Sequence, residues 1–277
     1  MNWFKRKFNK RLLVKIFAFY ILIVVLMYFF QRSFLYYPFG KILLTPEDFE
    51  QVNLTTTDNV NIYGWFKKPN KGQKTILYFH GNAGNLMGRS DRFENFGKYF
   101  GVLAISYRGY AKSSGNPSEK GFYIDAQTAL KFLRKNYIRD EDIIIFGESI
   151  GSAVAINLAS KYNFNAMILE APFTSIYDIA KDTYWFLPVN LILKDRFESS
   201  KLAPKISTPV LIFHATKDFV VPFSQGKQLY ELFNSEKRFI GVEGDFHIAL
   251  TADYLIKYIL EFNNQINDKN SKVKIKE

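Results

Sequence analysis

The chain has 277 residues, no cysteine, three histidines and a formal net charge of +11. A chain of this length can bury a full core, as one large α/β domain or as one domain with an appendage. The missing cysteines exclude disulfide scaffolds, thiolate zinc sites and cysteine nucleophiles. Three histidines are also too few to favour a multi-histidine metal centre, so we expect no bound metal.

The positive charge is concentrated at the two ends of the chain. Residues 1–15 carry six Lys or Arg and no acid, and residues 265–277 carry four Lys against two acids, which leaves +3 of the +11 for residues 16–264. A nucleic-acid-binding domain needs a basic face on its folded part, so this distribution does not favour a nucleic-acid partner. We expect 265–277 to be a flexible basic tail.

An apolar segment near the N-terminus predicts one transmembrane helix over residues 12–31. Residues 16–30 contain no charged side chain, and about 20 apolar residues are enough to cross a bilayer core. A buried core helix is less consistent with a segment that is apolar on every face. A cleaved signal peptide is the other alternative, but no small-x-small cleavage site follows, so we expect an uncleaved anchor.

The basic residues also predict the orientation of this anchor. Five Lys or Arg precede the span, and only Arg32 follows it closely. The excess of positive charge favours a cytoplasmic N-terminus, here residues 1–11, with the remaining chain on the far side of the membrane. In a Gram-negative cell, that side is the periplasmic face of the inner membrane.

Beyond a linker over 32–48, the pattern of residues 49–264 predicts one α/β domain. A hairpin over 51–67 turns at Asp58-Asn59. Apolar, strand-like runs follow and alternate with helical segments, which favours a mainly parallel sheet with helices on both faces. The runs cover 75–80, 102–107, 142–147, 166–173, 209–218 and 237–247, and the helical segments cover 91–100, 124–136, 150–162, 224–233 and 249–263.

Residues 174–205 interrupt this alternation and form a candidate lid. The segment is aromatic and broken by proline, and it lies between two predicted strands. Its side chains Tyr184, Trp185, Phe186 and Leu187 are candidate contacts for an acyl chain or a lipid-like substrate. They equally suit ordinary packing within an insertion.

The pentapeptide Gly147-Glu148-Ser149-Ile150-Gly151 matches the pattern G-x-S-x-G. An apolar strand directly precedes it and a small-residue helix directly follows, which is the context of a nucleophile elbow. The serine of such an elbow lies in a strained turn, and larger residues at the two glycines would clash with neighbouring elements. We therefore predict that Ser149 is a nucleophile. The alternative is a serine near a helix N-terminus with no catalytic role.

A serine nucleophile needs a base and an acid, here expected in the chain order Ser, Asp or Glu, His. His214 lies inside an apolar strand and is expected to be a core residue, whereas His247 follows the next strand. Asp218 comes at the end of the strand that contains His214, at the sheet edge where the sites of α/β proteins are built. We predict the triad Ser149, Asp218 and His247. The rival acids are Glu170, Glu243 and Asp245.

The negative oxygen of a tetrahedral intermediate needs two backbone N–H donors. One is expected from Ile150, the residue after the nucleophile, and the other from the loop 80–85 after the first apolar strand. The small residues of this loop allow the backbone to approach a substrate, and Asn82 is the predicted donor. His80 precedes Ser149 in the chain and is expected to shape the loop.

Several segments resemble the α/β-hydrolase superfamily, and more narrowly its membrane-anchored α/β-hydrolase-domain proteins, which are related to serine aminopeptidase-like hydrolases. The resemblance covers about residues 50–262. It implies the α/β-hydrolase fold and places the family's catalytic roles on Ser149, Asp218 and His247. The segments are HGNAGN (80–85), YRGYAKSSGNPSEKG (107–121), GESIG (147–151), EAPFTS (170–175), LKDRFESS (193–200), PVLIFHATKDFVVPFSQGKQLY (209–230) and FHIAL (246–250).

This chain departs from the usual family pattern at three positions. Ser106 replaces the usual Asp before Tyr-Arg-Gly, Ala215 replaces a Gly, and Phe246 replaces the Gly that commonly precedes the catalytic histidine. None of these changes removes a catalytic group, but Phe246 is expected to alter the pocket wall.

The sequence therefore predicts a membrane-anchored serine hydrolase that cleaves carboxylic ester or thioester bonds through an acyl-enzyme at Ser149. Its expected partners are a small-molecule or lipid-like ester and, through the N-terminal helix, the bilayer. The mechanism requires no cofactor and no metal. An amidase or peptidase with the same triad is one alternative, and a non-catalytic membrane-tethered module with the same fold is another.

Overall fold

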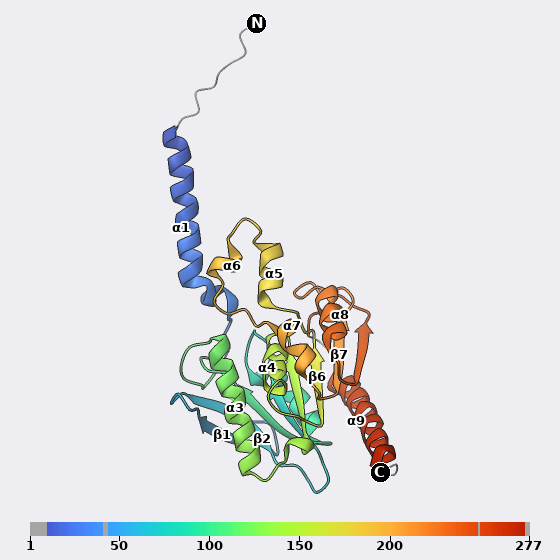
Figure 1. Ribbon diagram of the computed structural model, residues 1–277. Coiled ribbons are helices and arrows are strands. Elements are labelled where there is room, and N and C mark those ends of the chain that lie inside the picture. Colours follow the sequence, from blue (N-terminus) through green and yellow to red (C-terminus); the bar gives the residue numbers. More distant parts are fainter. Residues whose placement is uncertain (1–9, 41–43, 249, 275–277) are drawn as a thin grey trace.

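The computed structural model describes residues 10–40, 44–248 and 250–274, which form a central sheet, flanking helices and one long helix that leaves the domain (Figure 1). The sheet has eight strands in the order β1-β2-β4-β3-β5-β6-β7-β8. The strands are β1 (Glu50–Thr55), β2 (Asn61–Lys67), β3 (Thr75–Phe79), β4 (Gly101–Ser106), β5 (Ile143–Glu148), β6 (Ala166–Glu170), β7 (Val210–Ala215) and β8 (Lys237–Val242).

The strands pair as expected for a mainly parallel sheet. β1 and β2 form the predicted antiparallel hairpin, whose turn contains Asn59 in the left-handed region at φ 60°. β2 also pairs antiparallel with β4, and every pair from β4 to β8 is parallel. Because parallel strands share one direction, the carboxyl ends of β3, β5, β6, β7 and β8 meet at one edge of the sheet.

Helices cover both faces of the sheet, and each face has its own apolar core. One core includes side chains from α3, α4 and α8, and the other includes side chains from α2 and α9. Short 3₁₀ segments complete the connections at η1 (Leu86–Arg89), η2 (Asp140–Asp142) and η3 (Ala203–Lys205). The covering helices are α2 (Ser90–Gly97), α3 (Glu119–Lys135), α4 (Ile150–Ala159), α8 (Phe223–Leu232) and α9 (Ala252–Lys274).

Helix α9 corrects the prediction for the C-terminal end. We expected the last helix to end at 263 and a flexible tail to begin at 265, but α9 continues to Lys274. Phe262 and Ile266 are buried, and they extend the apolar face that begins at Leu255 and Ile259. Up to Ile266, the spacing of its apolar residues keeps one face against the domain.

Helix α1 (Lys10–Leu35) is the long helix that leaves the domain (Figure 1). Within the described ranges, it is the one helix long and apolar enough to cross a membrane by length and composition, and none of its residues is buried. It ends at Leu35 rather than 31, so the first part of the predicted linker over 32–48 is helical. Most of the basic segment 1–11, residues 1–9, lies outside the described residues.

The predicted lid, between β6 and β7, contains α5 (Ile176–Thr183), α6 (Val189–Ile192) and α7 (Ser199–Leu202). In Figure 1, α5 and α6 lie near the end of α1 that meets the domain. The Arg32 guanidinium donates to Asp195 at 2.7 and 3.0 Å, and Gln31 Nε2 donates to the carbonyl of Ile192 at 2.8 Å. These contacts attach the end of α1 to the lid segment.

Candidate active site

Ser149 lies in a sharp turn between β5 and α4. Its backbone adopts φ 48° and ψ −117°, a strained conformation for a residue with a side chain. A Cβ added to Gly147 would lie 2.5 Å from the carbonyl oxygen of Gly151, and one added to Gly151 would lie 2.2 Å from that of Phe79. Both positions therefore require glycine, for the steric reason that the pentapeptide predicted.

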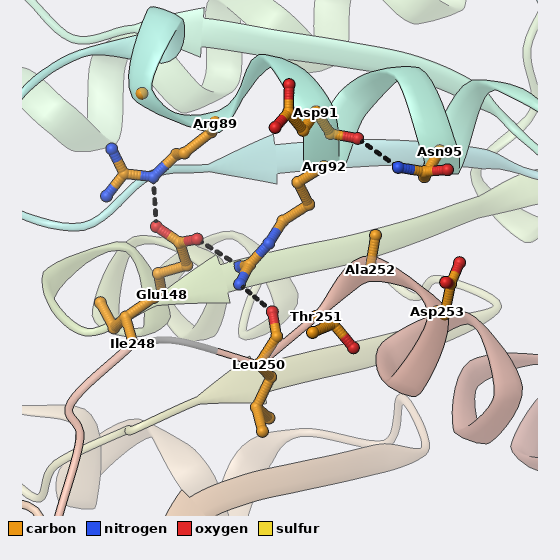
Figure 2. Close-up of a pocket in the computed structure, with 11 residues that line it drawn as sticks. Arg89, Asp91, Arg92, Asn95, Glu148, Ile248, Leu250, Thr251, Ala252 and Asp253 are labelled. Carbon is orange, nitrogen blue, oxygen red and sulfur yellow. Dashed lines mark hydrogen bonds and ion pairs between the residues drawn. The ribbon is translucent and has the colours of Figure 1, made fainter.

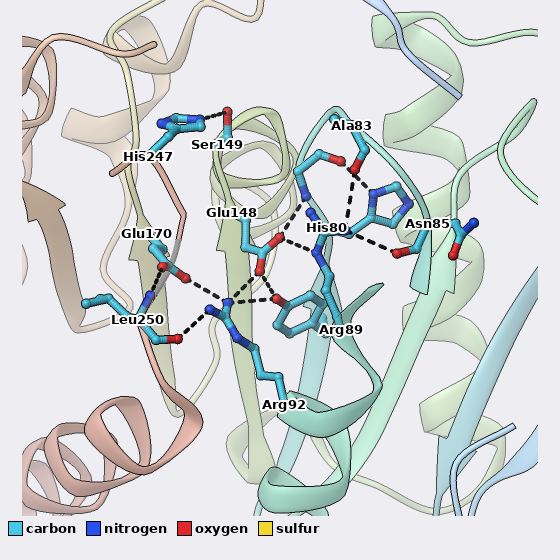
Figure 3. A network of polar contacts seen from close by, with 12 residues as sticks. His80, Ala83, Asn85, Arg89, Arg92, Glu148, Ser149, Glu170, His247 and Leu250 are labelled. Atoms are coloured by element: carbon cyan, nitrogen blue, oxygen red, sulfur yellow. Dashed lines mark hydrogen bonds and ion pairs between the residues drawn. The ribbon is translucent and has the colours of Figure 1, made fainter. Parts of the chain in front are cut away.

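The structure brings the three predicted triad residues together at the carboxyl edge of the sheet. His247 Nε2 lies 2.9 Å from Ser149 Oγ, as drawn in Figure 3, and His247 Nδ1 lies 2.7 Å from Asp218 Oδ2. Asp218 follows β7 and His247 follows β8, which are adjacent parallel strands. The hydrogen-bond chain has the nucleophile, base and acid geometry of a serine triad.

Asp218 is buried and held in its ionised form. Its Oδ1 accepts backbone N–H bonds from Val220 at 2.8 Å and Val221 at 2.9 Å. Burial alone would raise the pKa of this carboxyl, but the hydrogen bonds from His214, His247 and the Val221 backbone outweigh it and hold the pKa well below its usual value. An ionised Asp218 can orient His247 and stabilise its protonated form.

The competing histidine and acids have other partners, and His214 lies 3.5 Å from Asp218. His214 is a buried core residue, as predicted, and its Nε2 lies 3.0 Å from the carbonyl of Val221. Glu170, at the end of β6, pairs with Arg92, Glu243 pairs with Lys217 at the surface, and Asp245 is exposed.

A cavity of about 640 Å³ opens beside Ser149 and His247, within the size range typical of small-molecule sites. Its lining is mainly apolar, and it includes Phe246, one of the three positions where the sequence departs from the family pattern. The other residues that line it are Leu35, Tyr37, Asn82, Ala83, Arg89, Ile150, Phe173, Ile176, Ile179, Phe219, Val220, Val221 and Ile248.

Asn82 and Ile150, the predicted oxyanion donors, both line this cavity together with Ser149. The N–H of the neighbouring Gly81 donates to Glu148 Oε2 at 3.0 Å, which commits it to another partner. The side chain of Asn82 is fixed by Tyr110 Oη, which donates to Oδ1 at 2.9 Å, and by the carbonyl of Leu35, which accepts from Nδ2 at 2.5 Å. The role of the Asn82 and Ile150 N–H groups as oxyanion donors stays a prediction.

The four predicted lid contacts do not line the cavity beside Ser149. Tyr184 and Leu187 line a separate apolar groove, while Trp185 and Phe186 are exposed. The lid instead reaches the cavity through Ile176 and Ile179 on α5. Ser175 caps this helix by accepting a hydrogen bond from the Asp178 N–H at 2.9 Å. A serine followed by apolar residues three positions apart is the sequence pattern that could have identified this helix and its apolar face.

His80 is fully buried within the loop 80–85. Its Nδ1 lies 2.6 Å from the carbonyl of Gly81, and its ring packs against Tyr107 and Tyr110. Burial lowers the pKa of His80 to about 3. A neutral, packed imidazole suits the role of shaping the loop, which the sequence predicted.

A buried network of charges under Ser149 was missed by the sequence reasoning, which treated Glu148 as the variable residue of G-x-S-x-G. Arg89 Nε donates to Glu148 at 2.6 Å, and Arg92 Nη1 donates both to Glu148 at 2.5 Å and to Glu170 at 2.8 Å (Figure 3). The hydroxyl of Tyr78 also donates to Glu148. Arg89 and Arg92 together line an open cleft of about 530 Å³ behind the site (Figure 2).

This network joins three catalytic loops. Glu148 precedes the nucleophile and accepts from the Gly81 N–H, while Arg89 donates to the carbonyl of Asn85 at 3.1 Å. Arg92 donates to the carbonyl of Leu250, in the loop that follows His247, at 2.8 Å. Burial opposes ionisation of Glu148, but the two guanidinium groups outweigh it and lower its pKa.

Replacing Arg92 by methionine is expected to destabilise the protein by about 3–5 kcal/mol, because it leaves two buried carboxylates without their shared cation. The loss should be larger at high pH. The pKa of Glu170, which burial already raises, rises further without this cation, so the folded state regains stability by binding a proton as the pH falls. Urea unfolding of the detergent-solubilised protein, followed by tryptophan fluorescence, measures the change.

The matched control is Arg139→Met, which removes an exposed guanidinium paired with Glu141 and Asp142. Surface pairs of this kind contribute about 0–1 kcal/mol. Equal, small losses in both variants would show that the network does not stabilise the fold.

Comparison with known proteins finds similarity to hydrolases and to α/β-hydrolase-domain proteins. The family model described as serine aminopeptidase, S33, matches residues 70–191. The human alpha/beta hydrolase domain-containing protein 17B is 37% identical over 190 residues, which are 65% of this chain and 63% of the human protein. An uncharacterized protein of Acanthamoeba polyphaga mimivirus is 30% identical over 249 residues, which are 82% of this chain and 84% of the viral one.

Solved structures show the same architecture. An esterase of Pyrococcus furiosus superposes with a TM-score of 0.65 at 22% identity, covering 83% of this chain and 97% of the esterase. Such a match establishes the fold. With the sequence relatives, it shows that this chain belongs to the α/β-hydrolase superfamily, as an α/β-hydrolase-domain-containing protein. The chain spans somewhat less than two thirds of the length of the human relative that it matches.

Proposed function

We propose that this protein is a membrane-anchored serine hydrolase that cleaves carboxylic ester or thioester bonds. The observation that carries the proposal is the continuous hydrogen-bond chain from Ser149 through His247 to Asp218, at the edge of a mainly apolar cavity. The retained serine and histidine also argue against the non-catalytic module.

The geometry supports a two-step mechanism. His247 Nε2 takes the proton of Ser149 Oγ as that oxygen attacks the carbonyl carbon, and Asp218 stabilises the imidazolium that forms. His247 then protonates the leaving alcohol or thiol as its bond to the acyl carbon breaks. Water repeats the sequence, releases the acid and restores Ser149.

Two backbone N–H groups stabilise the negative oxygen of the tetrahedral intermediate in this proposal. Ile150 is the first residue of α4, and an N–H at the start of a helix has no intrahelical partner. Asn82 supplies the second N–H, because the Gly81 N–H is already committed to Glu148. The helix N-terminus adds a favourable field for the developing charge.

A fluorophosphonate probe tests this function directly, because it reacts with an activated serine. We expect one adduct per folded protein, on the tryptic peptide 140–161 that contains Ser149. Heat-denatured protein, in which the triad is dispersed, is the control and should remain unlabelled. An unlabelled folded protein, or an adduct on another peptide, would contradict the proposal.

An amidase with the same triad is the second candidate, and the match to the serine aminopeptidase family model favours it. Both reactions pass through the same tetrahedral chemistry, so the triad does not distinguish them. Parallel turnover of p-nitrophenyl esters and aminoacyl anilides by unlabelled protein from the same preparation decides between them. Faster turnover of the esters supports the proposed function, and faster turnover of the anilides supports the amidase.

The proposal includes an anchor, α1, and a catalytic domain on the far side of the membrane from the basic N-terminus. The length and apolar composition of α1 support the anchor, and the excess of Lys and Arg before it supports the orientation. A second form of the labelling experiment tests the orientation of the catalytic domain. In bacterial spheroplasts, a membrane-impermeant fluorophosphonate should label Ser149 as fully as in lysed cells, whereas labelling that requires lysis would reverse the orientation.

A further inference from the structure

A second apolar cavity lies between α1 and the lid helices α5 and α6, which stand near each other in Figure 1. It has a volume of about 250 Å³. Met27, Gln31, Phe34 and Leu35 supply the α1 wall, at spacings that place them on one helix face. The lid wall consists of Ile176, Ile179, Ala180, Thr183, Tyr184, Leu187, Val189, Ile192 and Leu193.

This groove adjoins the catalytic cavity. Leu35, Ile176 and Ile179 line both spaces, so the two share a wall at the point where α1 meets α5. A chain that extends from the acyl carbon at Ser149 could therefore pass these residues and continue between α1 and the lid.

The groove offers apolar surface and few free polar groups. Gln31 donates to the carbonyls of Tyr28 and Ile192, and its Oε1 accepts from the Lys194 N–H at 2.7 Å. The Thr183 hydroxyl donates to the carbonyl of Ile179 at 3.0 Å. Because the polar atoms of both side chains are already bonded, the lining suits a hydrocarbon chain rather than a polar ligand.

The groove also lies at the depth of the bilayer if α1 spans it. The lid contacts α1 at Gln31 and again at Tyr20, whose hydroxyl donates to the carbonyl of Phe186 at 2.9 Å. At a rise of 1.5 Å per residue, these two contacts lie about 17 Å apart along the helix axis. Trp185 and Leu191 expose most of their apolar surface beside it. A lid in this position would be surrounded by acyl chains, which is the ligand chemistry that the groove fits.

We propose that the groove between α1 and α5–α6 binds the fatty acyl chain of the substrate, which enters sideways from the bilayer to reach Ser149. The inference rests on the proposed function and deepens it. Helix α1 is then one wall of the substrate site as well as an anchor. The shared chemistry is a fatty acyl ester or thioester, whether it belongs to a membrane lipid or to a lipid-modified protein.

A photoreactive probe tests the path. A fluorophosphonate with a dodecyl chain and a terminal diazirine should first bond to Ser149 and, on illumination, crosslink to groove residues that do not line the catalytic cavity, such as Met27, Gln31 or Ala180. A matched probe with a butyl chain should crosslink only near the catalytic cavity. Crosslinks of the long probe to Phe219 or Val220, on another part of the cavity wall, would overturn the proposal.

A pair of variants tests the same path by kinetics in phospholipid nanodiscs. Ala180→Phe fills the groove at a residue that does not line the catalytic cavity, and Asp182→Phe adds the same bulk at an exposed position of the same helix. Each buried CH₂ contributes a factor of about four to binding, so excluding two of them should lower kcat/KM for p-nitrophenyl dodecanoate by about 15-fold. Hydrolysis of p-nitrophenyl butanoate should change less than about twofold, as should both substrates with Asp182→Phe.

The outcomes separate this proposal from the proposed function. Fluorophosphonate labelling of Ser149 in each variant shows that the fold and triad are intact. Equal losses for both esters in Ala180→Phe, or no loss for either, would overturn the acyl path while leaving the hydrolase intact. Labelling that fails in the wild type overturns the proposed function itself. Lipid esters and S-acylated peptides of equal chain length then distinguish the two sources of the acyl group.

Discussion

Replacing Ser149 by alanine is expected to lower kcat for ester hydrolysis by about 10⁶, with little change in KM or stability. The side chain lost is the attacking oxygen, so no acyl-enzyme can form, and only the oxyanion donors and binding remain to assist water. Alanine keeps the Cβ of serine and adds no atom, so the smaller side chain leaves the elbow sterically unchanged.

Two further variants sharpen this experiment. Serine and histidine act as a unit, so the double variant Ser149→Ala, His247→Ala should be no slower than either single variant. Ser114→Ala, which removes an exposed serine far from the triad in the chain, should retain full activity. If the loss of log kcat in the double variant equals the sum of the losses in the two single variants, Ser149 and His247 do not act together.

Replacing Asp218 by asparagine is expected to lower kcat by about 10⁴. The neutral amide cannot stabilise the imidazolium, and its NH₂ group can hold His247 in the tautomer that leaves no lone pair for the Ser149 proton. The fold should persist, since the amide oxygen can still accept the backbone N–H bonds from Val220 and Val221. Steady-state kinetics with a short p-nitrophenyl ester measure the effect.

The control for this variant is Glu243→Gln, a rival acid that pairs with Lys217 at the surface. It should keep wild-type kcat within about twofold, since surface pairs contribute little. If Glu243→Gln loses activity and Asp218→Asn retains it, the acid of the triad is Glu243 and not Asp218.

The depressed pKa of Asp218 also sets the pH behaviour of the wild type. A carboxyl whose pKa is lowered by folding contributes stability above its unfolded pKa of about 3.9, and that contribution is lost as the pH falls through the folded value. Between about pH 5 and 9, Asp218 therefore stays ionised, and its titration should add no limb to the pH–rate profile.

Most of the fold could be predicted from the sequence because local patterns carried it. Each predicted strand run overlaps a strand to within one residue at the start or end of β4 and β5, and Gly147 and Gly151 fix the position of the elbow for a steric reason that is local to the turn. Asp218 was favoured over the rival acids because its strand immediately precedes the histidine strand, and parallel strands deliver successive loops to one edge.

The network under Ser149 could not be predicted in this way. Arg92 lies in the predicted helical segment 91–100 and Arg89 just before it, and no local pattern gives either a buried partner, while Glu148 is a variable position of G-x-S-x-G. Their partners come from β5, β6 and the loop around Leu250, so the pairing depends on how α2 packs on the sheet. The same holds for the lid, where Ile176 and Ile179, rather than the more conspicuous aromatic residues, reach the cavity.

The sequence by itself determined the apolar N-terminal helix, the mainly parallel sheet and the three residues proposed for catalysis, because each depends on spacing within one segment or on strand order. Only the tertiary structure decided that Arg92 joins two buried carboxylates, that α9 packs on the domain as far as Ile266, and that α1 shares an apolar groove with the lid. These features arise from contacts between segments far apart in the chain, and their free energy depends on burial and geometry that no single segment encodes.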